Sequence, residues 1–256
     1  MSDDSLTAEQ RIQESQYEFP YHYVPEFGSE SFSQTRHWWW GFRYCAGLEV
    51  VFDALSDLDF ESLLDVGCGD GRFLREVNRQ YPAAGLLGID YSERAVDVAS
   101  ALNPDIEYRC LDITDDERLA SESYDVATLI EVLEHIPPDD LPSFLDGVVD
   151  ALGAHGSLVV TVPHENKPTQ EKHFQHFSGR ELERLLEPHF DRVEMIPFDQ
   201  IGSLGLRVAR KLLGGRGNHV VVTNDTLNQM FYSYYLDNYL YTTEEHCGRI
   251  AAVCRR

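Results

Sequence analysis

Short apolar runs alternate with segments of helical periodicity along most of this chain. Between the runs, apolar residues recur every three or four positions, as at Phe73, Leu74 and Val77, which is typical of a helix packed on one face. Strands that alternate with helices predict an α/β fold built on a parallel sheet, with right-handed connections. The apolar runs that predict buried strands lie at residues 61–66, 85–90, 106–110, 124–130 and 157–162.

The same pattern predicts where several helices begin and end. A helix is expected at 47–58, and another follows the first strand as far as Gln80. Ser92 can cap the helix after the second strand, and Ser178 with Glu181 forms a capping box for a later one. Further expectations are a helix from Leu141 that is ended by Gly153 and Gly156, strands at about 189–197 and 247–254, and a helix at 204–213.

The first strand runs directly into a glycine-dense turn, Asp65-Val66-Gly67-Cys68-Gly69-Asp70-Gly71. Glycines allow positive φ and the close approach of a ligand, and the following helix start offers unpaired N–H groups. The spacing is Gly-x-Gly-x-Gly, which differs from the dinucleotide fingerprint. Asp65 could accept hydrogen bonds from a cationic amine, whereas it would repel a pyrophosphate.

This turn resembles the first motif, D-x-G-x-G-x-G, of the class I S-adenosylmethionine (SAM)-dependent methyltransferases, in particular the small-molecule type 11/12-like members. The resemblance implies that SAM is the cofactor. It also implies that the methionine end is held by Asp65, Gly67, Cys68, Gly69 and Gly71. From the turn alone, a glycine-rich turn without a ligand and a nucleotide-binding Rossmann variant remain open.

Two further strand ends match that family. Asp90 ends the second strand, where an acid can accept hydrogen bonds from both ribose hydroxyls of an adenosine group, in NAD as well as in SAM. The resemblance implies that Tyr91 lies against the adenine. It implies also that Asp112 accepts from the exocyclic amine of the adenine, and that Ile113 packs on the ring.

The fourth strand opens onto Glu131-Val132-Leu133-Glu134-His135, which is similar to the segment that lies beside the sulfonium in small-molecule methyltransferases. Methyl transfer requires a positioned acceptor and often the removal of a proton. We therefore predict His135 and His173 as catalytic bases and Glu131 as a cofactor contact. Taken singly, each of these histidines fits a structural role as well. His164 and His176 are weaker candidates on the same loops.

The more specific alternative to a histidine base is a methyltransferase in which a metal ion activates the acceptor. The small-RNA 2′-O-methyltransferases and the ubiquinone-pathway O-methyltransferases resemble this chain through a Glu-x-x-Glu-His metal site. Glu131, Glu134 and His135 could hold Mg²⁺, Mn²⁺ or Zn²⁺. The string also occurs in family members without a metal, so the prediction assigns no metal ligands. The RNA variant is disfavoured because no basic phosphate-binding patch is visible.

The resemblance implies a Rossmann-like, seven-stranded sheet with helices on both faces. Residues 45–198 and 244–256 would form the SAM-binding domain, with 1–44 as an aromatic N-terminal lid and 199–243 as a cap insertion. Plain packing of the extension and a homodimer interface are the alternatives to a cap. Candidate lid residues, by analogy alone, are His22, Arg36, His37 and Trp38.

Composition bears on the source organism and the cellular location of the protein. The formal charge of −23 over 256 residues includes only three lysines, a surface style that we expect of a halophilic archaeon. The five cysteines form no CxxC pair, which predicts reduced thiols and a cytoplasmic protein. No run of about 18 apolar residues and no secretory signal is present, so no transmembrane segment is expected.

The sequence therefore predicts a SAM-dependent methyltransferase. We expect it to methylate an oxygen, rather than a nitrogen or a carbon, of a small molecule or of a glycan or lipid-linked intermediate. The alternatives are a metal-assisted RNA or quinone-precursor O-methyltransferase and a non-catalytic SAM-binding protein. An NAD-dependent enzyme is disfavoured by the glycine spacing.

Overall fold

The computed structural model describes residues 8–9, 12, 26–27, 32–33, 38–114, 119, 122–212 and 225–256. The candidate lid residues His22, Arg36 and His37 lie outside this part of the chain. Trp38 is described through its backbone, where it begins a helix.

A seven-stranded mixed sheet organises the molecule, in the order β5-β4-β3-β6-β7-β9-β8. The first five of these strands are parallel, and β9 runs antiparallel to both β7 and β8. The sheet strands are β3 (Ser62–Val66), β4 (Gly85–Asp90), β5 (Glu107–Cys110), β6 (Tyr124–Ile130), β7 (Leu152–Pro163), β8 (Arg192–Gln200) and β9 (Cys247–Arg255). A separate two-stranded pair joins β1 (Glu26–Phe27) to β2 (Phe32–Ser33).

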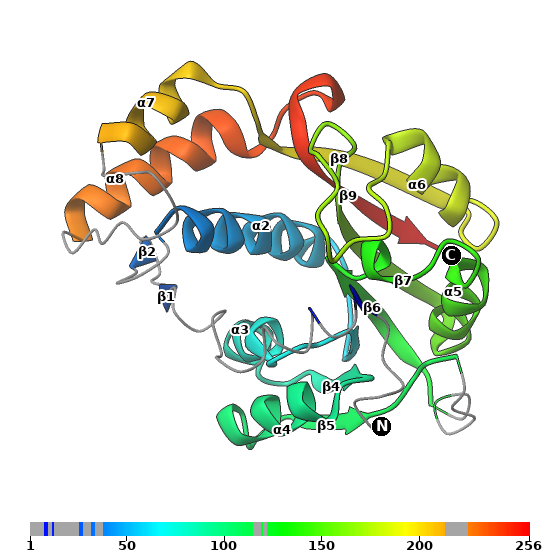
Figure 1. Cartoon of the computed structure of the whole chain (residues 1–256). Helices are drawn as coiled ribbons and strands as arrows, with labels where there is room; N and C mark the ends of the chain where they lie inside the picture. The colour runs from blue at the N-terminus through cyan, green and yellow to red at the C-terminus, as the bar shows by residue number, and fades with distance from the viewer. Residues whose placement is uncertain are drawn as a thin grey trace.

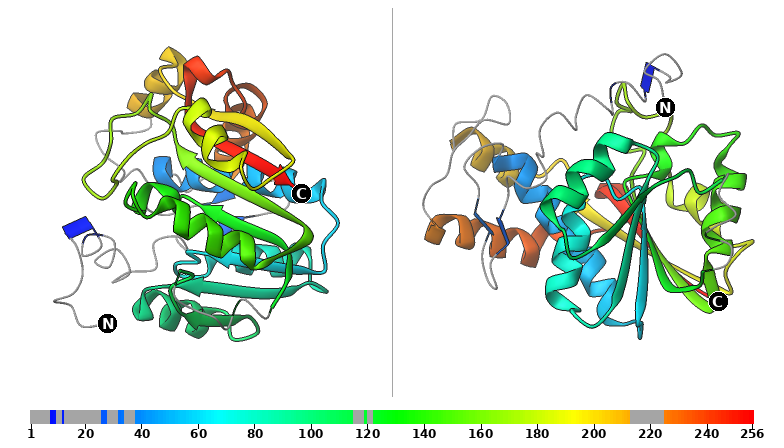
Figure 2. Two further views of the ribbon diagram at one scale, coloured as in Figure 1. Left: turned by 90° about the vertical axis from the view of Figure 1, so that its right-hand side faces the viewer. Right: turned by 90° about the horizontal axis from the view of Figure 1, so that it is seen from below.

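Helices cover both faces of the sheet. Figure 1 shows α2 and α3 on one side and α5 and α6 on the other, and Figure 2 gives two further views of the layers. The helices around the sheet are α2 (Trp38–Ser56), α3 (Arg72–Gln80), α4 (Glu93–Leu102), η4 (Leu133–His135), α5 (Leu141–Asp150) and α6 (Gly179–Leu186). The helices between β8 and β9 are α7 (Leu204–Leu212), α8 (Asp225–Tyr235), η5 (Leu236–Leu240) and η6 (Glu244–His246).

Two core clusters hold these layers together, because successive strand residues face opposite sides. Leu64 of β3 belongs to the cluster that includes Leu145 of α5 and Leu182 of α6. Its neighbour Leu63 belongs to the other cluster, with Leu55 of α2 and Leu74 of α3. The predicted α/β architecture with helices on both faces is thereby confirmed.

Several local predictions are confirmed in detail. Strands β4 and β6 have the predicted bounds. The Ser92 hydroxyl accepts from the backbone N–H of Ala95 at the start of α4 (3.1 Å). At the start of α6, the side chain of Ser178 and that of Glu181 form the expected capping box. These features depend on residues close in sequence, and the sequence therefore predicts them well.

Other bounds were wrong. Helix α2 begins at Trp38, nine residues before the predicted start at 47, because Gly41 and Gly47 do not interrupt it. Helix α5 ends at Asp150, and the two glycines predicted to end it lie inside β7. There the pairing of β7 with β6 shifts register, between the Tyr124–Leu152 and Val126–Ser157 pairs.

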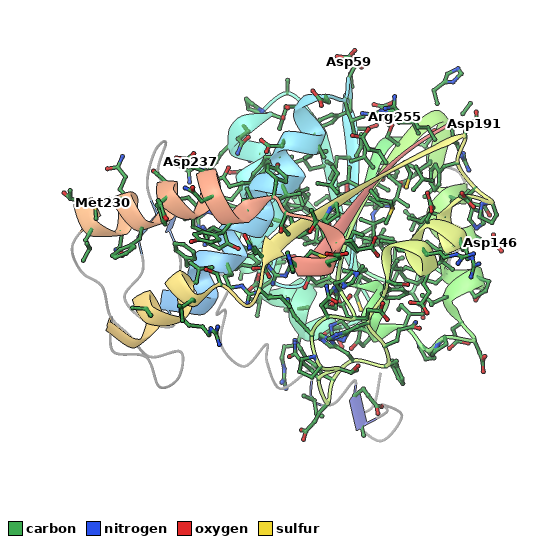
Figure 3. The ribbon with its side chains drawn as sticks, turned by 90° about the horizontal axis from the view of Figure 1, so that it is seen from above. Asp59, Asp146, Asp191, Met230, Asp237 and Arg255 are labelled. Carbon is green, nitrogen blue, oxygen red and sulfur yellow. The ribbon has the colours of Figure 1, made fainter. Side chains whose placement is uncertain are left out.

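The insertion between β8 and β9 packs against the start of α2. The Phe42 ring meets those of Tyr232 and Tyr235 of α8 edge to face, with centroids 5.6 and 4.8 Å apart. Met230 lies on the outer side of α8 and is exposed (Figure 3). The predicted domain boundaries at 44 and 198 fall inside α2 and β8, so both elements continue from the sheet domain into these segments. That the insertion caps the site stays a prediction.

The part of the chain that the structure describes contains no helix long and apolar enough to cross a membrane.

The β3–α3 turn depends on left-handed backbone. Gly67, Gly69 and Gly71 have φ values of 74°, 54° and 75°. A Cβ at Gly67 would lie 2.7 Å from Val132 Cγ2, and one at Gly71 would lie 2.6 Å from the Tyr108 hydroxyl oxygen. Both conformation and space therefore require glycine in this turn.

We predict that Gly71→Ala lowers the free energy of unfolding by about 3 kcal/mol, through left-handed strain and overlap with Tyr108. Gly202→Ala is the matched control, because Gly202 has φ 80° but nothing lies within 4 Å of its added Cβ. It should cost about 1 kcal/mol. Denaturant unfolding measures both, and equal losses would contradict the crowding at Gly71.

Candidate active site

The carboxyl ends of β3 and β4 form a cradle of backbone groups. The N–H groups of Gly67 and Cys68 donate to the Ile89 carbonyl (2.8 and 2.9 Å), which ties the glycine turn to β4. The N–H of Gly69 donates to Oδ2 of Asp90, and the N–H of Ser92 donates to Oδ1 of the same carboxylate, both at 2.9 Å. A carboxylate accepts about four hydrogen bonds, so this fixed orientation is compatible with bonds to ribose hydroxyls.

Asp65 is buried beneath this cradle. Its Oδ1 accepts a hydrogen bond from the Thr128 hydroxyl of β6 (2.6 Å). Burial, with a smaller contribution from the charge of Asp90, raises the pKa of Asp65 to about 7, although the Thr128 bond opposes the shift. A cation beside this carboxyl would favour its ionised form.

The three predicted adenine contacts, Tyr91, Asp112 and Ile113, come directly after β4 and β5. The exposed Asp112 carboxylate accepts from the backbone N–H (2.9 Å) and hydroxyl (2.8 Å) of Thr114, so it closes a local turn. Ile113 is buried in the core cluster that includes α5, and its carbonyl faces Gly147. Tyr91 is half-buried, and its carbonyl accepts from the Cys110 thiol (3.5 Å). Their adenine contacts stay predictions.

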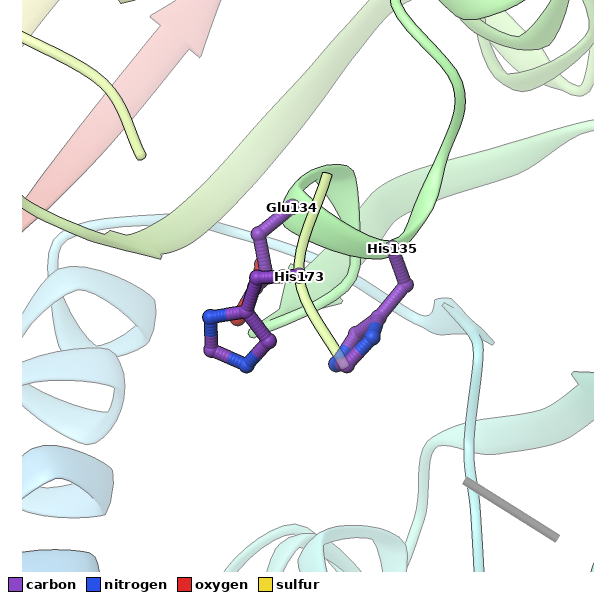
Figure 4. Close-up of side chains that lie close together, drawn as sticks. All are labelled: Glu134, His135 and His173. Atoms are coloured by element: carbon purple, nitrogen blue, oxygen red, sulfur yellow. The ribbon is translucent and has the colours of Figure 1, made fainter. Parts of the chain in front are cut away.

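A second group of polar side chains follows β6. Glu131 has a left-handed backbone, φ 56°, a conformation that directs the chain from β6 into η4. One carboxylate oxygen and two imidazole nitrogens, from Glu134, His135 and His173, lie within 4.8 Å of one another. Figure 4 shows the three side chains converging from η4 and from the loop after β7.

Hydrogen bonds assign the tautomers of these histidines. Nδ1 of His135 lies 2.9 Å from the Lys172 carbonyl, and Nδ1 of His176 lies 3.0 Å from the Lys167 carbonyl, so both nitrogens must donate. Nε2 of His176 is then an acceptor, and it receives the proton on Nδ1 of His173 (2.8 Å). The lone pairs of His135 and His173 are therefore left on their Nε2 atoms.

The electrostatics keep both imidazoles neutral. Burial, with the nearby charge of Lys172, lowers the pKa of His135 to about 4. Burial, with His135 and Lys172 beside it, lowers the pKa of His173 to about 3. Burial, with repulsion from Glu131, raises the pKa of Glu134, which is 1% exposed. Neither carboxylate oxygen of Glu134 has a hydrogen-bond partner in the described part of the chain.

The structure adds a cluster that the sequence analysis missed, centred on Asp199 at the end of β8. Arg43 of α2 donates to both carboxylate oxygens, from Nε at 2.7 Å and from Nη2, and the Tyr235 hydroxyl donates at 2.8 Å. Lys167 lies 3.4 Å away and Arg249 4.0 Å. These cations hold the pKa of Asp199 well below its usual range despite burial.

The predicted site residues thus fall into two groups along one edge of the sheet. Asp65, Gly67, Gly69 and Asp90 lie together at β3 and β4. Glu131, His135 and His173 lie together beyond β6 and β7, and Val132 against Gly67 joins the groups. The Asp199 cluster draws on four separate elements, so no local pattern could have identified it.

The fold is the one that the class I SAM-dependent methyltransferases share. Residues 63–156 match the family model described as a methyltransferase domain, and they include the cradle and η4. SAM, the cofactor of this class, fits the glycine turn and the Asp90 carboxylate.

Curated relatives cover part of the chain. A ubiquinone biosynthesis O-methyltransferase of Neisseria meningitidis serogroup C is 40% identical over 90 residues, which is 33% of this chain and 37% of that protein. The protein of the same name from Paracidovorax citrulli is 34% identical over 122 residues, 41% of this chain and 49% of that protein. The chain thus matches less than half of the length of these relatives. Both are bacterial, so they lend no support to a halophilic archaeal source.

Solved structures share the fold over most of the chain. A SAM-dependent methyltransferase from Archaeoglobus fulgidus has a TM-score of 0.57 at 16% identity, covering 84% of this chain and 94% of that one. The N-methyltransferase NodS from Bradyrhizobium japonicum, solved with S-adenosylhomocysteine (SAH), has a TM-score of 0.55 at 17% identity, covering 84% and 87%.

The buried Asp65 predicts a pH-dependent affinity for SAH. Its pKa of about 7 is raised by folding, so the stability it contributes is present at low pH and lost as pH rises through about 7. The ammonium group of SAH beside Asp65 would favour the ionised form. Binding should therefore release protons and strengthen about tenfold between about pH 6 and pH 8.

Calorimetry at several pH values measures this effect. Asp65→Asn should flatten the profile, whereas Asp97→Asn, at an exposed carboxylate of α4, should keep it. A profile in Asp65→Asn as steep as in the wild type would show that another group titrates.

Proposed function

We propose that this protein transfers the methyl group of SAM to an oxygen of a small molecule. The observation that carries the proposal is the β3–β4 cradle, in which the glycine turn and the Asp90 carboxylate are held together by the Gly69 N–H. The matched methyltransferase domain and relatives named as O-methyltransferases support it.

The chain's own residues would divide the work between the two groups. The cradle binds the adenosine and the amino acid end of the cofactor, and SAM supplies an electrophilic methyl group. Glu131, Glu134, His135 and His173 lie on the β6–β7 side, where they can orient the acceptor and receive its proton. A cytoplasmic location is consistent with the five free thiols. The small-molecule or lipid-linked acceptor and the homodimer stay predictions.

The Glu134–His135–His173 group favours the metal-assisted form of this reaction. A general base works best with a pKa near the working pH, whereas these imidazoles have pKa values of about 4 and 3. Neutral Nε2 lone pairs, each fixed by a bond at Nδ1, are what a metal ligand requires. The buried carboxylate oxygens without partners complete a two-histidine, one-carboxylate donor set.

We therefore propose that Glu134, His135 and His173 hold a divalent cation, in contrast to the sequence prediction of two catalytic bases and no metal. Such a cation would lower the pKa of a bound acceptor hydroxyl. Glu131 stays outside this donor set, because only Glu134, His135 and His173 bring donor atoms within 4.8 Å of one another. A quinone precursor with adjacent hydroxyls suits this site and agrees with the names of the relatives.

Asp90→Asn tests the cofactor proposal. The variant loses the charge that strengthens the ribose bonds, and its single amide oxygen can accept from only one of the Gly69 and Ser92 N–H groups. Calorimetry should show a loss in SAH affinity of about a hundredfold, or about 2.7 kcal/mol. Asp97→Asn, at an exposed position of α4, is the matched control. Binding of NADH in place of SAH by the wild type would contradict the proposal.

Metal binding tests the second part. Equilibrium dialysis of the wild type with Mn²⁺ or Zn²⁺ should show one saturable site per chain, and chelation should abolish methyl transfer. Glu134→Gln and His173→Asn should weaken binding by about tenfold to a hundredfold. His189→Asn, at a surface histidine near Asp146, should bind as the wild type does. Full activity after chelation would contradict metal assistance.

A further inference from the structure

Two cations, Arg249 and Lys167, lie beside the Glu134–His135–His173 group but belong to neither proposed task. Arg249 stands at the start of β9, and its Nε is 3.3 Å from Oε2 of Glu131. Lys167 stands in the loop after β7, and its Nζ is 3.4 Å from Oδ2 of Asp199. Their side chains are 17% and 19% exposed, so both charges are largely removed from water.

Arg249 and Lys167 both have N–H groups that make no hydrogen bond to the described residues. Among the residues that the structure describes, the Arg249 guanidinium makes one hydrogen bond, from Nη1 to the Arg43 carbonyl (3.2 Å), and its buried Nε makes none. Across the described residues, the Lys167 ammonium has an ion pair but no hydrogen bond. A guanidinium has five N–H donors and an ammonium has three. Asp199 cannot use them all, because Arg43 and Tyr235 already bond its oxygens.

The net charge of the side chains around Arg249 and Lys167 is positive, whereas the net charge of the whole protein is negative. The described charged side chains gathered here are four cations, Arg43, Lys167, Lys172 and Arg249, and three acids, Glu131, Glu134 and Asp199. The chain as a whole carries −23. An excess of buried positive charge is costly unless an anion compensates it. The protein retains this excess where a ligand would supply that anion.

The position of the pair assigns it to the acceptor rather than to the cofactor. In the sheet order, β9 lies three strands from β3, on the far side of β6 and β7. At about 4.8 Å per strand, this is about 14 Å from the strand that carries the glycine turn. The Asp90 cradle lies one strand further away still.

We propose that Arg249 and Lys167 bind a carboxylate of the methyl acceptor. The acceptor is then a hydroxy acid, held by its carboxylate while its hydroxyl lies toward Glu134 and the two histidines. A carboxylate would compensate part of this positive excess, to which the proposed divalent cation would add. This inference rests on the proposed function, since it names the acceptor class of the same site.

The test uses the full chain saturated with SAH and three aromatic probes: protocatechuate, its methyl ester and phenyl phosphate. Calorimetry should show that the wild type binds protocatechuate about tenfold more tightly than the ester, because the ester lacks the charge. Lys167→Gln and Arg249→Gln should each reduce this ratio to about one. Arg180→Gln, at an exposed arginine of α6, should leave it unchanged.

Each other outcome overturns the inference. Equal affinity of the acid and its ester, tighter binding of phenyl phosphate, or no saturable binding of any probe would show that the pair does not recognise a carboxylate. Loss of SAH affinity in Arg249→Gln and Lys167→Gln would assign the pair to the carboxylate of the cofactor instead. Thermal unfolding separates a misfolded variant from a specific loss, and the wild-type ratio needs no variant. SAH affinity reports separately on the proposed function.

Discussion

The hydrogen bond from the Gly69 N–H to Asp90 is the interaction on which the site depends. It joins a turn after β3 to the last residue of β4, and the Gly67 and Cys68 bonds to Ile89 reinforce it. The turn can approach β4 this closely because its glycines adopt left-handed backbone. The same geometry places the Asp90 carboxylate beside the glycine turn at the carboxyl edge of the parallel strands, where open α/β sheets bind adenosine groups.

The sheet then sets the relation between the two halves of the site. Strand β6 lies next to β3, so Asp65 and Thr128 meet beneath the cradle while Glu131 and η4 emerge beside it. At β3 and β4, the carboxyl edge of the sheet is formed by the backbone of the glycine turn. Beyond β6, the same edge carries buried titratable side chains. The Glu134 carboxylate has no hydrogen-bond partner among the described residues, and one ring nitrogen each of His135 and His173 lies within 4.8 Å of one of its oxygens. Such costly burial is typical of functional sites.

The sequence predicts the parts of this arrangement that are local. The glycine turn is contiguous, Asp90 ends a strand that the hydrophobic pattern predicts, and the capping box at Ser178 spans four residues. The predicted start of α2 was wrong, because its first turns contain aromatic residues and two glycines, which do not form a recognisable helical pattern. Tertiary packing stabilises the helix there. The Asp199 cluster could not be predicted, since its bond to Arg43 joins residues 156 positions apart. The sequence could place His135 and His173 on two loops. Only their hydrogen-bond partners indicate whether each histidine is a metal ligand or a catalytic base.

A crystal structure of the complex with SAH tests the central claim most directly. We expect ribose hydroxyls on the Asp90 carboxylate, the homocysteine over the glycine turn, and the sulfur directed toward Glu134, His135 and His173. SAH bound with its ribose away from Asp90, or with its sulfur on the side of the cradle away from β6, would contradict it.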